Sequence, residues 1–90
     1  MEIAATSLDN LIKVLEEQRA KRQLDHRQFS AFLGISESYW SMIRTGERKP
    51  NLNVLSIMMQ KLPEITPEAI MYILQTIKQG NDDTIQKGQG

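Results

Sequence analysis

Side chains that could carry out nucleophilic or acid–base chemistry are scattered along this chain of 90 residues. The chain has no cysteine and a single histidine, His26, which has neither an acid-rich nor a glycine-rich segment around it. Disulfides and thiolate metal sites are therefore excluded, and one histidine cannot build a zinc site alone. A phosphate-cradling glycine loop is also missing from the sequence. We therefore expect no enzyme, no cofactor and no metal site.

Positive charge is concentrated in the middle of the chain. The net charge of the whole chain is zero, but residues 1–18 carry −3, residues 19–49 carry +4 and residues 50–90 carry −1. Phosphate binding needs a local basic patch rather than a basic total, although ordinary solvated helix faces would explain the same charges. Helix starts and basic loops suit anions, and His26 could equally be a plain surface residue. The candidate phosphate contacts are His26, Arg27, Tyr39, Arg48 and Lys49.

Five helical segments would hold these side chains in place. Apolar residues that recur every three to four positions predict helices over residues 8–22, 26–33, 36–45, 52–61 and 67–78. The predicted N-caps are Ser7, Asp25, Asn51 and Thr66, with Ser36 at the start of the third helix. The predicted helix ends are Gly34, Gly46 and Pro63. Short turns between these helices predict one compact all-α bundle.

The last helix and the residues after it complete the predicted domain. Its inward side is predicted to carry Ile70, Ile73, Leu74 and Ile77. Met71 and Tyr72 would then point away and offer a dimer surface. Residues 79–90 hold three glycines and almost nothing to bury. We therefore predict a domain over residues 1–78 and a disordered polar tail over residues 79–90.

Composition and hydropathy indicate a globular protein outside the membrane. Hydrophobic residues make up 40% of the chain and charged residues 24%, which is usual for a globular domain. No apolar run approaches the ~20 residues that are needed to cross a bilayer. Residues 1–8 do not follow the pattern of a signal peptide. We expect a cytoplasmic protein, associated with the nucleoid if it binds DNA.

Residues 26–45 combine a helix, a glycine turn and a second helix. Phe29 and the small Ser30 stand where the two helices would touch, and Ile35 would be tucked under the turn. Trp40 and Ile43 would form the apolar face of the second helix, with Trp40 in the core. Such a hairpin leaves the opposite face of that helix free to enter the major groove of a duplex.

This pattern resembles the Cro/phage-repressor-type helix-turn-helix family over residues 8–74. The matching parts are FLGIS at 32–36, IRTGERKP at 43–50 and the apolar helix at 52–62. The spacing Ile-x-x-Gly-x-x-x-Pro within 43–50 is the most specific of these. The resemblance implies a five-helix, lambda-repressor-like domain that binds double-stranded DNA as a homodimer on a two-fold-symmetric operator. A repressor-like transcriptional regulator is the function that it implies.

The resemblance also implies which side chains would face the bases. Glu37 could accept from a cytosine amino group, Ser38 and Ser41 could bond to donors or acceptors, and Met42 could touch a thymine methyl. Thr45 would lie at the edge of the contact. The alternative for Glu37 is that it only eases the dipole at the start of a helix that Ser36 caps.

Several positions depart from the family pattern. The family usually has glutamine at His26, alanine at Ser30 and a smaller aliphatic residue at Trp40. At Arg44 it commonly has a glutamate that pairs with an arginine of the first helix, which here would be Arg19. Two arginines cannot form that pair. We therefore hypothesise that Arg44 turns to Glu16 or Glu17, or to a phosphate.

A second class of function fits the same features. The zero net charge, the acidic Glu37 and the histidine at position 26 would also suit a protein-interaction module on this scaffold, such as an antitoxin or a regulatory adaptor. A regulatory protein partner is expected in that case. Strong dependence of duplex binding on salt would distinguish the regulator from the module.

Overall fold

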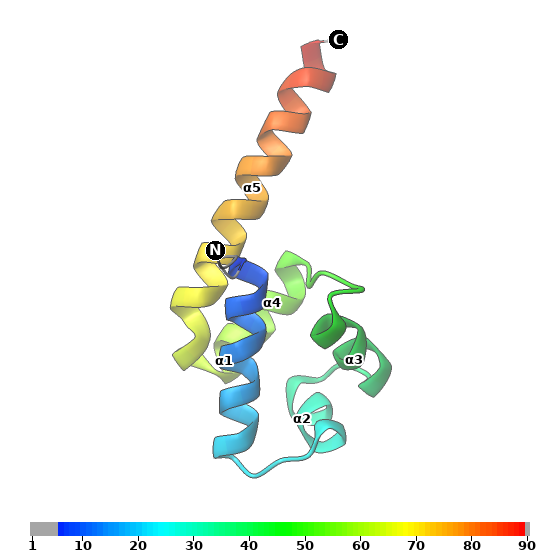
Figure 1. The fold of residues 1–90 in the computed structure, drawn as a ribbon, viewed down its shortest axis with the longest axis vertical. Helices are drawn as coiled ribbons and strands as arrows, with labels where there is room; N and C mark the ends of the chain where they lie inside the picture. The colour runs from blue at the N-terminus through cyan, green and yellow to red at the C-terminus, as the bar shows by residue number, and fades with distance from the viewer. Residues whose placement is uncertain (1–5, 90) are drawn as a thin grey trace, which may run out of the picture.

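Five α-helices and one short 3-10 helix make up the computed structural model, which describes the backbone of residues 6–89 and the side chains of residues 6–77. The elements are α1 (Ser7–Lys21), α2 (His26–Leu33), α3 (Glu37–Thr45), α4 (Leu52–Lys61), η1 (Pro63–Ile65) and α5 (Thr66–Gln89). Figure 1 shows α1 and α5 along one side of the molecule and α2 and α3 on the other. No strand occurs between residues 6 and 89, so the predicted all-α architecture is confirmed.

The helix starts are capped by short polar side chains. For α1 the cap is Thr6 rather than the predicted Ser7: the hydroxyl of Thr6 accepts from the backbone N–H of Asp9 at 3.0 Å, and the Asp9 carboxylate accepts from the backbone N–H of Thr6 at 3.3 Å. Only this register lets an acid at the third helical position return the bond, which explains the shift by one residue. The predicted caps Asp25, Ser36 and Asn51 are confirmed for α2, α3 and α4.

A glycine follows each of the helices α2 and α3. Gly34 follows α2 with φ +79° and Gly46 follows α3 with φ +82°. Residues with a side chain rarely adopt this left-handed backbone conformation, so glycine is the residue that lets the chain turn sharply here. The helix ends that were predicted at these two glycines are confirmed.

The core lies where α1, α2, α3 and α4 converge with η1 and the first turns of α5. Trp40 is fully buried at its centre, and the ring of Phe29 meets it edge-on with centroids 5.1 Å apart. This arrangement suits two aromatic rings, and it confirms Trp40 as a core residue. The buried apolar residues are Leu11, Leu15, Phe29, Leu33, Trp40, Ile43, Leu55, Met58, Leu62, Ile65, Ala69 and Tyr72.

The buried face of α5 is not the predicted one. Ala69 is fully buried and Tyr72 is 6% exposed, whereas Ile70, Leu74 and Ile77 are exposed. Ile65 of η1 enters the core first, and residues four and seven positions further on then continue the same helix face. The prediction for Ile70, Leu74 and Ile77 was therefore wrong, and so was the outward orientation of Tyr72; Met71 does point outward.

Tyr72 joins α5 to the turn before α4. Its hydroxyl donates to the carbonyl oxygen of the buried Pro50 at 3.5 Å. Burial is the main reason that the pKa of Tyr72 is raised above the ordinary tyrosine value, because the phenolate would have to leave water.

Helix α5 is longer than the sequence predicts. It runs to Gln89 instead of ending near residue 78, and Figure 1 shows its C-terminal half projecting beyond the bundle. The predicted disordered tail over residues 79–90 thus falls on backbone that continues α5 through Gln89, while its side chains and residue 90 lie outside the described residues. Of the helices described, none combines the length and apolar character needed to span a membrane.

Candidate nucleic-acid interface

The junction of α2 and α3 is built around a small buried side chain. Ser30 is 3% exposed, and its hydroxyl donates to the carbonyl oxygen of Arg27 at 2.8 Å. The carbonyl oxygen of Ser30 accepts from the backbone N–H of Ile35 at 3.0 Å, across the glycine turn. The bonds satisfy a buried hydroxyl and hold the turn against α2, so α3 leaves the turn in a fixed direction.

Helix α3 has one buried and one open face. Trp40 and Ile43 are fully buried, so they fasten the helix to the core. None of the five candidate base-contacting residues is buried. Glu37, Ser38 and Thr45 are exposed, and Ser41 and Met42 are half-buried. The Thr45 hydroxyl donates to the carbonyl oxygen of Met42 at 3.2 Å, which leaves its oxygen free to accept.

Three of the candidate phosphate contacts are exposed cations. Arg27 is exposed in the first turn of α2, and Arg48 and Lys49 are exposed in the loop that follows α3. The backbone N–H of Arg48 donates to the carbonyl oxygen of Met42 at 3.1 Å, which ties this loop to the last turn of α3. Among residues 6–77, no ion pair involves any of these three side chains. Their charges are therefore not neutralised by a carboxylate of the described residues, although Lys49 lines a small pocket with Thr6 and Tyr72 rather than with α3.

Tyr39 and His26 are the two candidate phosphate contacts that are half-buried. Tyr39 lies in the first turn of α3, where its backbone N–H donates to the Ser36 hydroxyl at 3.0 Å. His26 is held from inside the bundle, because its Nδ1 accepts from the indole N–H of Trp40 at 3.1 Å. The neutral imidazole then carries its proton on Nε2, and only Nε2 is left for an outside ligand.

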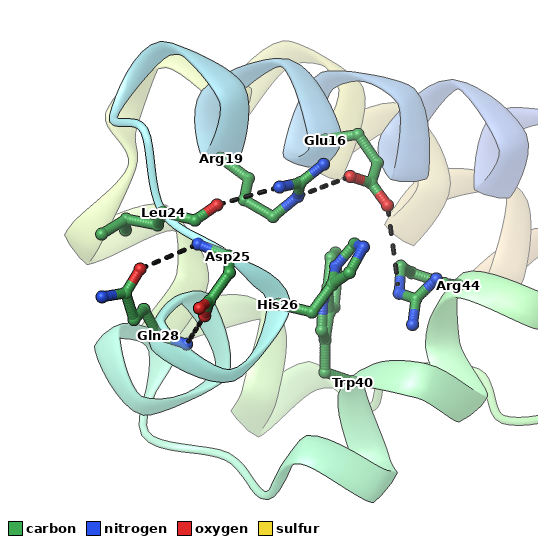
Figure 2. A network of polar contacts seen from close by, with 8 residues as sticks. All are labelled: Glu16, Arg19, Leu24, Asp25, His26, Gln28, Trp40 and Arg44. Carbon is green, nitrogen blue, oxygen red and sulfur yellow. Dashed lines mark hydrogen bonds and ion pairs between the residues drawn. The ribbon is translucent and has the colours of Figure 1, made fainter.

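Arg44 connects α3 to α1 through Glu16. Figure 2 shows the Glu16 carboxylate between two guanidinium groups. Its Oε1 accepts from Arg19 Nε at 2.8 Å, and its Oε2 lies 3.9 Å from Arg44 Nε. Arg19 also donates through Nη1 to the carbonyl oxygen of Leu24 at 2.9 Å. Of the alternatives left open for Arg44, the structure has the pairing with Glu16.

The Arg44 pairing is looser than that of Arg19. The Arg44 guanidinium lies over the Trp40 ring, 5.8 Å from its centroid, and Arg44 Nε is buried without a hydrogen-bond partner. The side chains of Arg44 and Glu16 are 29% and 31% exposed, so water screens the pair. An ion pair in this setting contributes little stability by itself, and its effect is mainly to orient the end of α3.

The structure brings all ten candidate residues onto α2, α3 and the loop after α3. A second surface feature was not predicted: a groove between α1 and α5, which includes Met71 and Leu74 in its lining. The sequence held a signal for it, since α5 has more large apolar residues than one buried face can hold.

No cluster of three metal-ligating side chains occurs in the described part of the chain. Comparison with protein-family models, curated proteins and solved structures finds no match to this chain.

Proposed function

We propose that the chain is a sequence-specific DNA-binding regulator of the repressor type, in which α2 and α3 act as a helix-turn-helix and α3 enters the major groove. The observation that carries this proposal is the two-sided character of α3. Trp40 and Ile43 anchor it, while Glu37, Ser38 and Thr45 are open to solvent. A helix with one face packed into the core and a polar face open to solvent suits the major groove of DNA, which is wide enough to admit a helix.

The flanking cations supply the sequence-independent part of the proposed binding. Arg27 at the start of α2 and Arg48 and Lys49 after α3 would neutralise phosphates on either side of the inserted helix. The start of α2 adds a favourable dipole, and Nε2 of His26 is a donor on the same helical turn. These contacts would hold the domain on the duplex without selecting a sequence.

Base selection in this proposal rests on short side chains. Ser38 and Ser41 would bond to base edges, and Met42 would contact a thymine methyl. Their reach is small, so the proposal requires α3 to lie deep in the groove. The proposed activity is binding, without catalysis, cofactor or metal.

The test is a titration of random duplex DNA at two salt concentrations, followed by selection of bound sites from a random pool. For about four phosphate contacts, affinity should fall about 100-fold between roughly 50 and 200 mM salt. The selection should then return a consensus sequence. No binding at either salt concentration contradicts the proposal.

A protein-interaction module is the second candidate, and Glu37 is the residue that favours it. Its carboxylate is exposed at the first position of α3, and no ion pair of the described residues involves it. Phosphates repel such a group unless it accepts from a base. A Glu37→Gln variant distinguishes the two functions: a reader of cytosine changes its preferred base, whereas a module binds no duplex in either form.

A further inference from the structure

A groove with a volume of about 860 Å³ lies between α1 and α5. Its lining includes Val14 from α1 and Met71 and Leu74 from α5, and the last two side chains are 60% and 55% exposed. Ile70 and Ile77 of α5 are also 45% and 49% exposed. Single exposed apolar residues are normal on a protein surface, but a contiguous set beside a groove marks an interaction site. We name Ile70, Met71, Leu74 and Ile77 the α5 stripe.

The α5 stripe has the spacing that suits a helical ligand. Ile70, Leu74 and Ile77 follow one another at intervals of four and three residues, which is the spacing of a helix–helix seam. These three side chains span about 10 Å along the helix axis. A line of apolar side chains along one helix fits a second helix better than it fits a small molecule.

The two ends of the groove differ in charge. Figure 1 shows α1 and α5 side by side and running in opposite directions, and the Ser7 hydroxyl donates to Gln75 Oε1 at one end. At the other end the groove is lined by Glu17, near the C-terminal end of α1, and by Glu68, in the first turn of α5. A ligand in the groove therefore meets uncharged polar groups at one end and two carboxylates at the other.

Neither carboxylate at this acidic end is neutralised by the described side chains. None of their ion pairs involves Glu17 or Glu68, and Glu68 is half-buried. Lys13 lines the groove one turn before Glu17, but it is exposed and pairs with neither acid. The lining therefore holds two negative charges and one positive charge, which favours a ligand that brings a cation to the acidic end.

We propose that the groove binds an amphipathic helix of a different protein, with its apolar residues against the α5 stripe and a lysine or arginine beside Glu17 and Glu68. The difference between the two ends fixes the direction of the bound helix, because only one direction brings its cation to the carboxylates. The residues that line the groove belong to α1 and α5, so α3 stays open while the helix is bound. The inference therefore holds whether or not the chain binds DNA.

Selection from a displayed library of helical peptides, with the full chain as the target, supplies the probe. Peptides of about 18 residues span about 27 Å as a helix, which is long enough to cover the stripe. The selected peptides should have apolar residues at intervals of three and four and a lysine or arginine toward one end. The proposal is overturned if no peptide is enriched, or if the enriched peptides carry acidic residues in place of the basic ones.

Fluorescence anisotropy of a labelled selected peptide then locates its site, with Leu74→Asp as the variant and Leu52→Asp as the matched control. Leu52 is 64% exposed but lies on α4, outside the groove. Leu74→Asp should weaken binding at least about 10-fold, because the bound helix would bury the new carboxylate against apolar side chains. Leu52→Asp should bind as the wild type does. Circular dichroism establishes that each variant is folded, and equal binding by both variants overturns the proposal.

The charge at the acidic end has its own test, which leaves the apolar surface unchanged. Glu68→Gln should weaken binding of the same peptide about five-fold, because a partly exposed ion pair contributes up to about 1 kcal/mol. Glu47→Gln is the matched control, since Glu47 is exposed in the loop after α3 and does not line the groove. An equal effect of the two variants contradicts the proposed cation. If the wild type sediments as a dimer that Leu74→Asp dissociates, a second copy covers the stripe and the proposal is overturned.

Discussion

The indole of Trp40 has one N–H, and His26 accepts it at 3.1 Å. This bond gives the polar edge of a large buried aromatic residue a partner inside the bundle. The bulk of the ring fills the space beneath α3, and its polar edge reaches a histidine that stands at the first position of α2. The side chains of His26 and Trp40 therefore act as one structural unit that joins α2 to α3.

Removing the acceptor should leave the indole N–H without a partner. We expect His26→Ala to lower the free energy of unfolding by about 1–2 kcal/mol, with Trp40→Phe as the companion variant that removes the donor. Urea unfolding of both single variants and the double variant measures the coupling. The loss from His26→Ala should be smaller in the Trp40→Phe background. Full additivity would contradict the bond.

Reversing one charge of the Glu16–Arg44 ion pair, which joins α1 to α3, should lower the stability of the fold. Arg44→Glu places a second carboxylate beside Glu16, so we expect a loss of up to about 1 kcal/mol in unfolding free energy. In a Glu16→Gln background, which removes the carboxylate, the loss from Arg44→Glu should be smaller. Thermal unfolding at low ionic strength measures both. A marked gain in stability from Arg44→Glu alone would count against the pairing.

At the scale of the elements, α2, α3 and α4 could be predicted closely from the sequence. Their starts are marked by Asp25, Ser36 and Asn51, which bond to backbone N–H groups within the first turn, and Gly34 and Gly46 mark two of their ends. These signals are local, so neighbouring residues decide them. The faces of α2 and α3 that pack inward were predictable for the same reason.

The orientation of α5 could not be predicted in this way. Its large aliphatic residues suggested the buried face, yet the face that packs inward carries Ala69 and Tyr72. That choice depends on η1, which puts Ile65 into the core and so sets the register of the following helix. A small residue at position 69 also allows close packing, and size alone does not reveal this from sequence. The arrangement of Glu16 between two arginines likewise depends on how α1 and α3 meet.

The anchoring of α5 by Tyr72 should depend on pH. Because the pKa of Tyr72 is raised in the folded state, its contribution to stability is complete below the ordinary value of 10.0 and is lost as the pH rises through the higher folded value. Unfolding measured from pH 8 to pH 11 should therefore show a decline above about pH 10. Tyr72→Phe should have a smaller decline, and an equal decline in both proteins would contradict this role.

For the whole molecule, the positions of the charged side chains say more about possible partners than the net charge does. The net charge is zero, but Arg27 at the start of α2 and Arg48 in the loop after α3 are exposed cations, whereas Lys49 of the same loop lines a pocket with Thr6 and Tyr72. On α1, in contrast, Glu16 pairs with Arg19 and Arg44, and Lys13 and Glu17 line the groove beside α5. In the proposed function, the exposed arginines would contact the duplex, whereas the groove beside α5 has an apolar and mixed-charge lining.

The proposed duplex binding makes a quantitative prediction for the loop after α3. Arg48→Ala should weaken binding similarly for every sequence and lower the slope of log affinity against log salt by about 1. Lys61→Ala is the matched control: Lys61 is also exposed, but its ammonium group donates to the carbonyl oxygen of Phe32 at 2.8 Å and is engaged there. Fluorescence anisotropy of a labelled duplex measures both slopes. An unchanged slope in Arg48→Ala would show that this residue contacts no phosphate.

Trp40 is the only tryptophan in the sequence, and it is fully buried beneath α3. The native chain therefore carries its own optical probe. Excitation of the indole reports on the joint between α2 and α3 without a label, and acrylamide quenching measures how often that joint opens. A ligand that shifts α3 should change this emission, whereas one that binds only at the far end of α5 should leave it unaltered.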